Sequence, residues 1–475
     1  MAVSIRNISA PGYADDLQIK TDTRAMSVAT ALFFMVGFLT CLNDIVIPHL
    51  KSIFELNYAE AMLVQFAFFS SYFVFSYPGG ALVEKFGYKK TMVLGLLVMA
   101  AGAAGFIPAA KLALFPVFLA ALIILAAGMT IVQVAVNPYV TVIGPAATAS
   151  SRLNLAQAFN SFGTFIAPFF GGLLILRNAV AVMPPERLKS MSDVARQTYR
   201  ALQASTVRLP YIGIALTLVI LALALALIKL RPQASTADRT QDFRPGAFAE
   251  ALTQRDSIWH HPWLIGGALG IFAYVGAEVS IGSLLVNYMG LHQIAGLHES
   301  TAAPFLMVYW GGAMTGRFVG SAILQRVRTG PLLGCAAIVA FALVVTSILA
   351  HGSTDVWMLP AMHLWHWNWQ LFIPKSLAMW SLLFVGLFNS IMFPSIFTLG
   401  IQDLGSLTSK GSSLMIAAIV GGAIIPETTG KLADIIGLHH AFVIPAICYI
   451  YIAAYGIAAL RRPAGSDVLL PVEPV

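Results

Sequence analysis

Long apolar runs alternate with short polar segments along almost the whole chain. Runs such as 92–110 and 212–228 contain no charged residue. A helix that crosses a bilayer needs roughly 20 apolar residues, whereas a spanning β-strand is shorter and alternates apolar with polar positions. Because the runs are long and nearly unbroken, they predict an all-α integral membrane protein.

The pattern predicts about twelve transmembrane helices in two six-helix halves. Their expected positions are 26–48, 58–82, 91–110, 113–143, 152–176, 210–230, 262–289, 301–324, 331–350, 376–402, 411–433 and 440–460. A polar segment separates the sixth run from the seventh. The expected organisation is an N-terminal tail (1–25), a first half (26–230), a linker (231–261), a second half (262–460) and a C-terminal tail (461–475).

An internal repeat supports the two halves. The segment 138–144 has the same proline-to-glycine spacing as the segment 394–400, and the next run holds Pro168 in one half and Pro426 in the other. Parallel repeats of six spans occur in transporters, where the substrate site lies between the halves near the middle of the bilayer.

Composition and charge agree with a membrane protein. Apolar residues make up 58% of the chain and charged residues 10%, against about 25% charged residues in soluble proteins. The net charge of +7 comes from basic clusters between the runs, which indicates membrane topology rather than nucleic-acid binding. Lys and Arg favour the side of the N-terminus, so both termini are expected in the cytoplasm. The first 25 residues lack the apolar core of a signal peptide.

Two acids lie inside apolar runs, where a charged side chain costs about 2.5–3.5 kcal/mol. They are Asp44, which follows Asn43, and Glu278. A carboxyl group there can hold a proton and hydrogen-bond the hydroxyl groups of a sugar, so both acids are candidates for ion coupling and substrate binding. The alternatives are a helix-end position for Asp44 and a structural hydrogen bond between helices for Glu278.

Five amide side chains form a second candidate set. Gln133 and Asn137 are four positions apart, and Gln157 and Asn160 three apart, so each pair shares one helix face. Asn389 falls at the repeat position of Gln133. Amides both donate and accept hydrogen bonds, which suits a polyhydroxylated ligand, although they also serve as contacts between helices.

Other motifs give no sign of an enzyme. The chain has no phosphate-binding Gly-Lys-Ser/Thr motif, no Gly-x-Ser-x-Gly element and no His-Glu-x-x-His helix. An ATP-driven pump and a membrane hydrolase are therefore unsupported, and no cofactor or metal is expected. Arg317 is expected near the cytoplasmic face in a structural role.

Several of these stretches resemble the fucose:proton symporter family of the major facilitator superfamily. They are Leu42-Asn-Asp-Ile-Val-Ile-Pro48 and the segments 136–145, 152–163, 274–278 and 393–400, spread over nearly the whole chain. Within the family, the segment 278–283 is most similar to the bacterial glucose/galactose porters. The resemblance implies a twelve-helix bundle, alternating access and proton-coupled uptake across a bacterial inner membrane.

The resemblance matches Asp44 to the family's first-span aspartate, and Gln157 and Asn160 to its fifth-span amides. One feature departs from the family pattern. Fucose symporters have a glutamate implicated in proton coupling where this chain has Gln133, and a glutamine where it has Glu278. Gln133 cannot titrate, so Asp44 or Glu278 is expected to couple the ion, with Asp44 favoured, unless coupling uses another cation such as sodium.

The expected function is that of a monomeric secondary transporter, not an enzyme. It would import a hexose of the glucose or galactose type together with a cation, which we expect to be a proton. An N-acetylglucosamine porter and a fucose porter are close alternatives. A drug or metabolite exporter, a non-transporting nutrient sensor and a membrane-embedded enzyme are the alternatives of other kinds.

Overall fold

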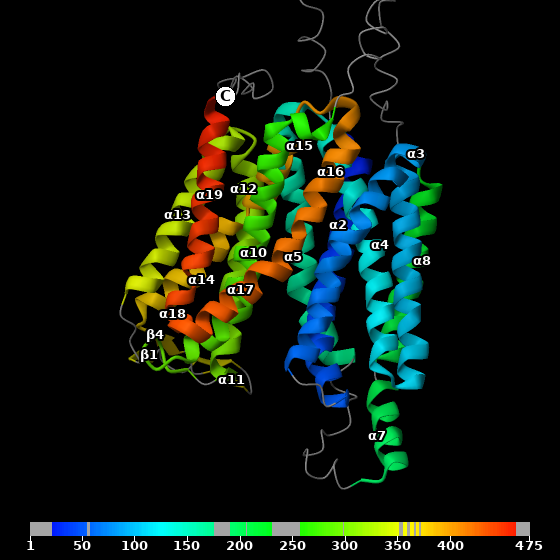
Figure 1. Cartoon of the computed structure of the whole chain (residues 1–475), viewed down its shortest axis with the longest axis vertical. Helices are drawn as coiled ribbons and strands as arrows, with labels where there is room; N and C mark the ends of the chain where they lie inside the picture. Colours follow the sequence, from blue (N-terminus) through cyan, green and yellow to red (C-terminus); the bar gives the residue numbers. More distant parts are fainter. Residues whose placement is uncertain are drawn as a thin grey trace, which may run out of the picture.

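Two helical bundles lie side by side, with their helices running along the long axis of the molecule (Figure 1). The computed structural model describes residues 21–54, 58–174, 191–205, 207–229, 257–297, 299–350, 355–358, 362–364, 367–369 and 372–461. Nearly all of the predicted linker lies outside these residues, as do most of the N-terminal tail and the C-terminal tail beyond residue 461.

The described residues of the first half form six α-helices. They are α2 (Thr23–Phe54), α3 (Tyr58–Leu112), α4 (Phe115–Val142), α5 (Ala149–Leu174), α7 (Asp193–Ser205) and α8 (Arg208–Leu227). Two spans make up α3, and they join at Gly87, whose φ is 75° and ψ 169°. Glycine lacks a Cβ atom and adopts this positive φ readily, so the chain turns here without a long loop.

The described residues of the second half form ten α-helices, several of them short. They are α10 (Pro262–Gly290), α11 (Glu299–Ala302), α12 (Leu306–Ile323), α13 (Thr329–Leu349), α14 (Leu377–Asn389), α15 (Met392–Ile401), α16 (Thr408–Ala417), α17 (Gly421–Ile436), α18 (Leu438–Ala441) and α19 (Val443–Ala458). One predicted span corresponds to α14 and α15 together, and another to α16 and α17. Both spans are broken near their middle.

The predicted number of spans is confirmed. Nine segments of the described residues are long and apolar enough to cross a membrane, and one of them, Phe66–Leu112, holds both spans of α3. The helices α5 and α12 supply the two spans that remain. Some boundaries differ: α2 continues through Pro48 to Phe54, and α12 begins at Leu306 because the turn Ala303–Phe305 precedes it.

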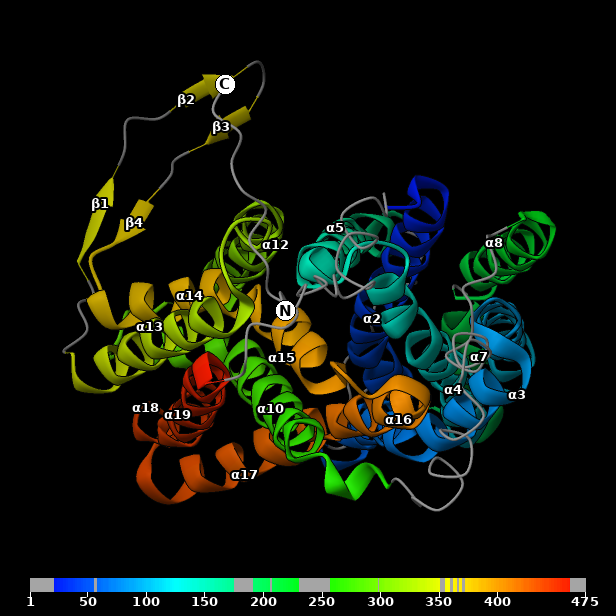
Figure 2. The same ribbon diagram turned by 90° about the horizontal axis from the view of Figure 1, so that it is seen from above.

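The connection between α13 and α14 contains four short strands, which the all-α prediction did not include. They are β1 (Val356–Met358), β2 (Met362–Leu364), β3 (Trp367–Trp369) and β4 (Phe372–Pro374). The antiparallel pairs β1–β4 and β2–β3 form a narrow ribbon beside the bundles (Figure 2). Such pairing satisfies the backbone donors and acceptors of a segment that forms no helix.

The two halves are held together by hydroxyl groups on one side of the molecule. We call it the Gly87 side, after the turn of α3, and the end of α19 lies there too; we call the opposite side the α7 side (Figure 1). At the start of α5, Ser150 and Thr398 form a hydrogen bond of 2.6 Å, and Ser151 donates to the Ser321 carbonyl at 2.7 Å. These short contacts close the Gly87 side.

At the start of α16, serines of the second half donate to main-chain carbonyl groups of the first half. Ser409 donates to the Gly80 carbonyl, and Ser412 donates to the Val134 carbonyl, each at 2.9 Å. The Val134 carbonyl would normally accept from the residue four positions on, but this is Pro138, which has no N–H. A proline in one half thus leaves an acceptor that a serine of the other half uses.

Candidate functional site

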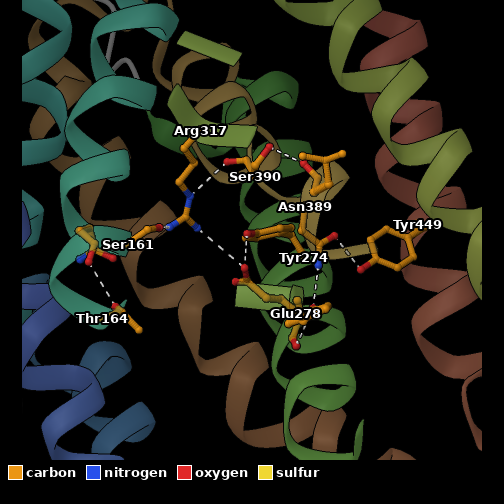
Figure 3. A network of polar contacts seen from close by, with 11 residues as sticks. Ser161, Thr164, Tyr274, Glu278, Arg317, Asn389, Ser390 and Tyr449 are labelled. Atoms are coloured by element: carbon orange, nitrogen blue, oxygen red, sulfur yellow. Dashed lines mark hydrogen bonds and ion pairs between the residues drawn. The ribbon is translucent and has the colours of Figure 1, made fainter. Parts of the chain in front are cut away.

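A buried polar network lies in the second half, where it faces the first (Figure 3). Glu278 of α10 accepts a hydrogen bond from the Tyr274 hydroxyl at 2.7 Å, and its Oε1 lies 3.8 Å from Nη2 of Arg317 on α12. The side chains of Glu278 and Arg317 are 12% and 11% exposed. The Tyr309 hydroxyl donates to the Glu278 carbonyl at 3.2 Å. The acid is therefore paired with one base and held by two tyrosines.

Asn389, at the end of α14, joins three helices of this network. Its Nδ2 donates to the Tyr309 hydroxyl at 3.0 Å, and its Oδ1 accepts from the Tyr449 hydroxyl at 2.8 Å. Tyr309 lies on α12 and Tyr449 on α19. One amide thus satisfies two buried hydroxyl groups and fixes their orientation.

Arg317 connects the network to the first half. Its Nε donates to the Ser390 carbonyl at 3.2 Å, its Nη1 donates to the Ser161 hydroxyl on α5, and its own carbonyl accepts from Asn154 at 2.6 Å. The Ser390 carbonyl is free for this bond because Pro394, four positions on, has no N–H. The break between α14 and α15 therefore supplies an acceptor for the arginine.

The sequence predicted Arg317 near the cytoplasmic face in a structural role, and it did not predict the place of this residue in the network. The side chain is buried well inside α12, against Glu278 and across from Ser161. A sequence signal for this position did exist, since a lone arginine inside an apolar run carries the same energetic cost that singled out the two acids.

The amides of α4 form a separate pair within the first half. The Gln133 side chain donates to the Tyr72 hydroxyl on α3 at 2.9 Å, and Asn137 donates to the Gln133 carbonyl at 2.8 Å. Oδ1 of Asn137 is buried and has no hydrogen-bond partner in the described part of the chain. These two residues share a helix face as predicted, but no hydrogen bond joins them to the network around Glu278 within the described residues.

The amides of α5 lie beside the residue that Arg317 contacts. Asn160 donates to the Phe33 carbonyl of α2 at 3.0 Å. Gln157 is buried and makes no hydrogen bond within the described residues. Asn43 and Asp44 belong to α2, but their side chains lie outside the described part of the structure. The structure thus joins Glu278 with Asn389 and places Asn160 next to Ser161 at the edge of their network.

A cavity of about 720 Å³ opens elsewhere, between α2, α5 and α8. Its lining is mostly apolar, with Phe34, Phe38, Phe170, Leu209 and Ile214 among its residues, and it contains no carboxyl or amide side chain. Ser205 and Thr217 supply its polar side chains, so it offers few of the hydrogen-bonding groups that a polar ligand requires. No group of three or more metal-binding side chains occurs in the described ranges.

Two bundles of spanning helices that meet at a buried network of acid, base and amide groups define a multi-pass membrane carrier. A family model described as Major Facilitator Superfamily matches residues 26–426. The chain therefore belongs to the major facilitator superfamily.

Named relatives agree with this assignment over nearly the full length. The glucose/galactose transporter of Brucella abortus biovar 1 (strain 9-941) is 46% identical over 457 residues, which cover 96% of this chain and 99% of the relative. The L-fucose-proton symporter of Escherichia coli (strain K12) is 34% identical and covers 88% of this chain and 89% of the relative. A crystal structure of the transporter FucP in the outward conformation has a TM-score of 0.76 at 33% identity, and covers 91% of this chain and 98% of that one. The resemblance to the fucose symporters and the glucose/galactose porters is confirmed.

Proposed function

We propose that this protein is a secondary active transporter that imports a hexose of the glucose or galactose type together with a proton. The network of Glu278, Arg317 and Asn389 carries this proposal, because it places acid, base and amide groups where the second half faces the first. Transporters of this architecture bind substrate in such a place, and these groups suit a ligand with many hydroxyl groups. Similarity to relatives named as glucose/galactose and fucose transporters favours the same substrate class.

The proposed site extends beyond the network to both halves. Its residues are Asn43, Asp44, Gln133, Asn137, Gln157, Asn160, Glu278 and Asn389. Asp44 and Glu278 are proposed to couple the ion, because each is an acid inside a spanning helix.

The proposed location is the bacterial inner membrane, with both termini in the cytoplasm and the protein acting as a monomer. The Gly87 side is then cytoplasmic. Hydroxyl contacts between the halves close that side, and the fold is similar to that of FucP in the outward conformation. Both observations favour a transporter whose site faces the outside.

Transport by the purified protein in proteoliposomes tests the function. We expect counterflow of labelled glucose or galactose without any ion gradient, and accumulation of the same sugar when a proton gradient is imposed. Fucose and N-acetylglucosamine should exchange more slowly, and a sodium gradient should have no effect. Faster exchange of fucose or N-acetylglucosamine would mean that the assigned substrate is wrong. Uptake driven by a sodium gradient would mean that the assigned ion is wrong. If none of the four sugars exchanged, the proposal as a whole would be contradicted.

A further inference from the structure

Several hydrogen bonds join α5 to the second half. Among those in the described residues, the bond made by Arg317 lies furthest from the Gly87 side. Ser151 lies in the first turn of α5, whereas Ser161, which accepts from Arg317, follows ten positions later. At 1.5 Å per residue this is about 15 Å deeper. The other hydrogen bonds between α5 and the second half join neutral groups. The guanidinium of Arg317 is therefore the charged group in these hydrogen bonds.

The guanidinium group has three partners, and one of them carries a charge. The Ser390 carbonyl and Glu278 belong to its own half, while Ser161 belongs to the other. The Glu278 carboxyl contacts Tyr274 of its own helix and Arg317 of α12. Tyr309 of α12 contacts the main-chain carbonyl of Glu278, and Tyr449 of α19 lies beyond Asn389. Arg317 is thus the one charged group facing Glu278 within the described residues.

We infer that Arg317 is a positioning residue that transmits the charge of Glu278 to the contact between the two halves. This inference rests on the proposed function. While Glu278 is ionised, it offsets the guanidinium charge and holds the fork of the side chain against Ser161, so the Gly87 side stays closed. One buried charge compensates another, and the neutral partners complete the geometry.

Proton uptake by Glu278 breaks this balance. A hydronium ion transfers its proton to the carboxylate, so one O–H bond breaks in the hydronium, one forms on the carboxyl group and a water molecule is left. The guanidinium then stays buried without a counter-ion. An uncompensated charge in a membrane helix is unfavourable. Separation of the halves on the Gly87 side admits water to Arg317 and relieves that cost.

The sign of this effect suits proton-driven import. Protonated Glu278 favours the separated state of the Gly87 side, and ionised Glu278 favours the closed state. A proton that arrives from the α7 side therefore promotes opening toward the Gly87 side. Release of the proton restores the ion pair and favours return to the closed state.

Distance measurements between spin labels test the inference. Labels would be attached through Lys85→Cys and Arg326→Cys, two exposed positions on the Gly87 side of the two halves, after replacement of Cys41, Cys335 and Cys448. The measured quantity is the fraction of molecules with the longer distance between the two labels, which we call the long-distance population. In nanodiscs without sugar, we expect this fraction to rise from alkaline to acidic pH. Arg317→Gln and Glu278→Gln should both lose this shift.

Ser151→Ala is the matched control, because it removes a hydroxyl contact between the halves without touching Arg317. It should raise the long-distance population at every pH and keep the shift. Ser161→Ala should weaken the shift, since it removes the partner of Arg317 in the first half. Arg317→Lys keeps the charge but loses the planar fork, and should also weaken the shift.

A full pH shift in Arg317→Gln overturns the inference. Should that variant fail to fold, a full shift in both Arg317→Lys and Ser161→Ala overturns it equally. Sugar counterflow by the wild-type protein decides the proposed function separately, because the distance measurement needs no sugar. The protein could show a pH shift that depends on Arg317 and yet exchange no hexose. That result would exclude the proposed substrate and support the role of Arg317.

Discussion

Asn389 satisfies two buried tyrosine hydroxyl groups at once, which makes it the most sensitive amide of the network. Asn389→Leu would leave the Tyr449 hydroxyl without its acceptor, at about 1–3 kcal/mol for an unsatisfied buried group. The Tyr309 hydroxyl would lose one partner but would still donate to the Glu278 carbonyl. We expect a lower midpoint of thermal unfolding in detergent and weaker sugar binding. Tyr449→Phe keeps the bond to Tyr309 and should lower the midpoint less. Equal midpoints for Asn389→Leu and the wild type would contradict the assigned role.

Asp44 and Glu278 should differ in what their neutral variants lose. Asp44→Asn is expected to abolish accumulation of sugar against its gradient and to spare counterflow, because exchange needs no net proton movement. Glu278→Gln should raise the apparent KM for sugar in counterflow about tenfold, which corresponds to about 1.4 kcal/mol of binding free energy, and should also weaken accumulation because it removes the carboxyl group whose protonation opens the Gly87 side. Uptake driven by an imposed proton gradient and counterflow, measured on the same proteoliposomes, separate the two effects. Accumulation by Asp44→Asn would exclude Asp44 as the carrier of the proton.

Part of the network could be predicted from single residues. Glu278 and Asn389 stand out because a polar group in an apolar run needs a partner. Their actual partners, Tyr309 and Tyr449, could not be predicted, because tyrosines are common in membrane helices and the contacts join residues far apart in the chain. Arg317 had a signal of the same kind as Glu278, but its position near a basic cluster suggested a helix end instead.

At the scale of helices, the apolar pattern predicted the spans and missed their breaks. The segment 376–402 contains no charged residue and only scattered polar ones, so its overall hydropathy does not separate α14 from α15. Pro394 marks the region, since it removes one N–H from the helix ladder. Which side chain then uses the freed carbonyl depends on the packing of α12, and the local sequence does not encode that packing.

Gly80 is needed where α3 meets α16 on the Gly87 side. A Cβ atom at this position would collide with the Ser413 hydroxyl of the other half. We therefore expect Gly80→Val to destabilise the closed state and to increase the reactivity of a cysteine placed at Ser150. Gly311→Ala is the control, because a Cβ atom there meets no other group within 4 Å. Unchanged reactivity in Gly80→Val would show that the close approach does not hold the halves together.

At the scale of the whole molecule, the repeat of 138–144 in 394–400 correctly predicted two similar bundles. The side on which they meet could not be predicted. Both states of a carrier share one sequence and differ by rigid movement of the halves, so hydrophobic periodicity is the same in each. The contacts of Ser150, Ser151 and Ser409 define the state that the structure shows.

The proposed orientation of the molecule in the bilayer rests on its basic residues. Because Lys and Arg concentrate on the cytoplasmic side of membrane proteins, we expect a green fluorescent protein fused to the C-terminus to fluoresce. Alkaline phosphatase inserted between β2 and β3 should be active, since β1 and β4 of the same connection lie on the α7 side (Figure 1). The reverse pair of signals in whole cells would invert the topology and, with it, the assignment of the closed side.

The Ser390 carbonyl that anchors Arg317 has a consequence for mutational scanning. Substituting Ser390 leaves the acceptor in place, because the acceptor is the main chain. Pro394→Ala, by contrast, supplies an amide that competes with Arg317 for the same oxygen atom. A scan of the protein would therefore find Ser390→Ala tolerated, because it keeps a small side chain at this buried position, and would find sensitivity one helical turn away. Among variants of this chain, changes at 317 and 394 should then depend on one another, although no hydrogen bond joins the two side chains.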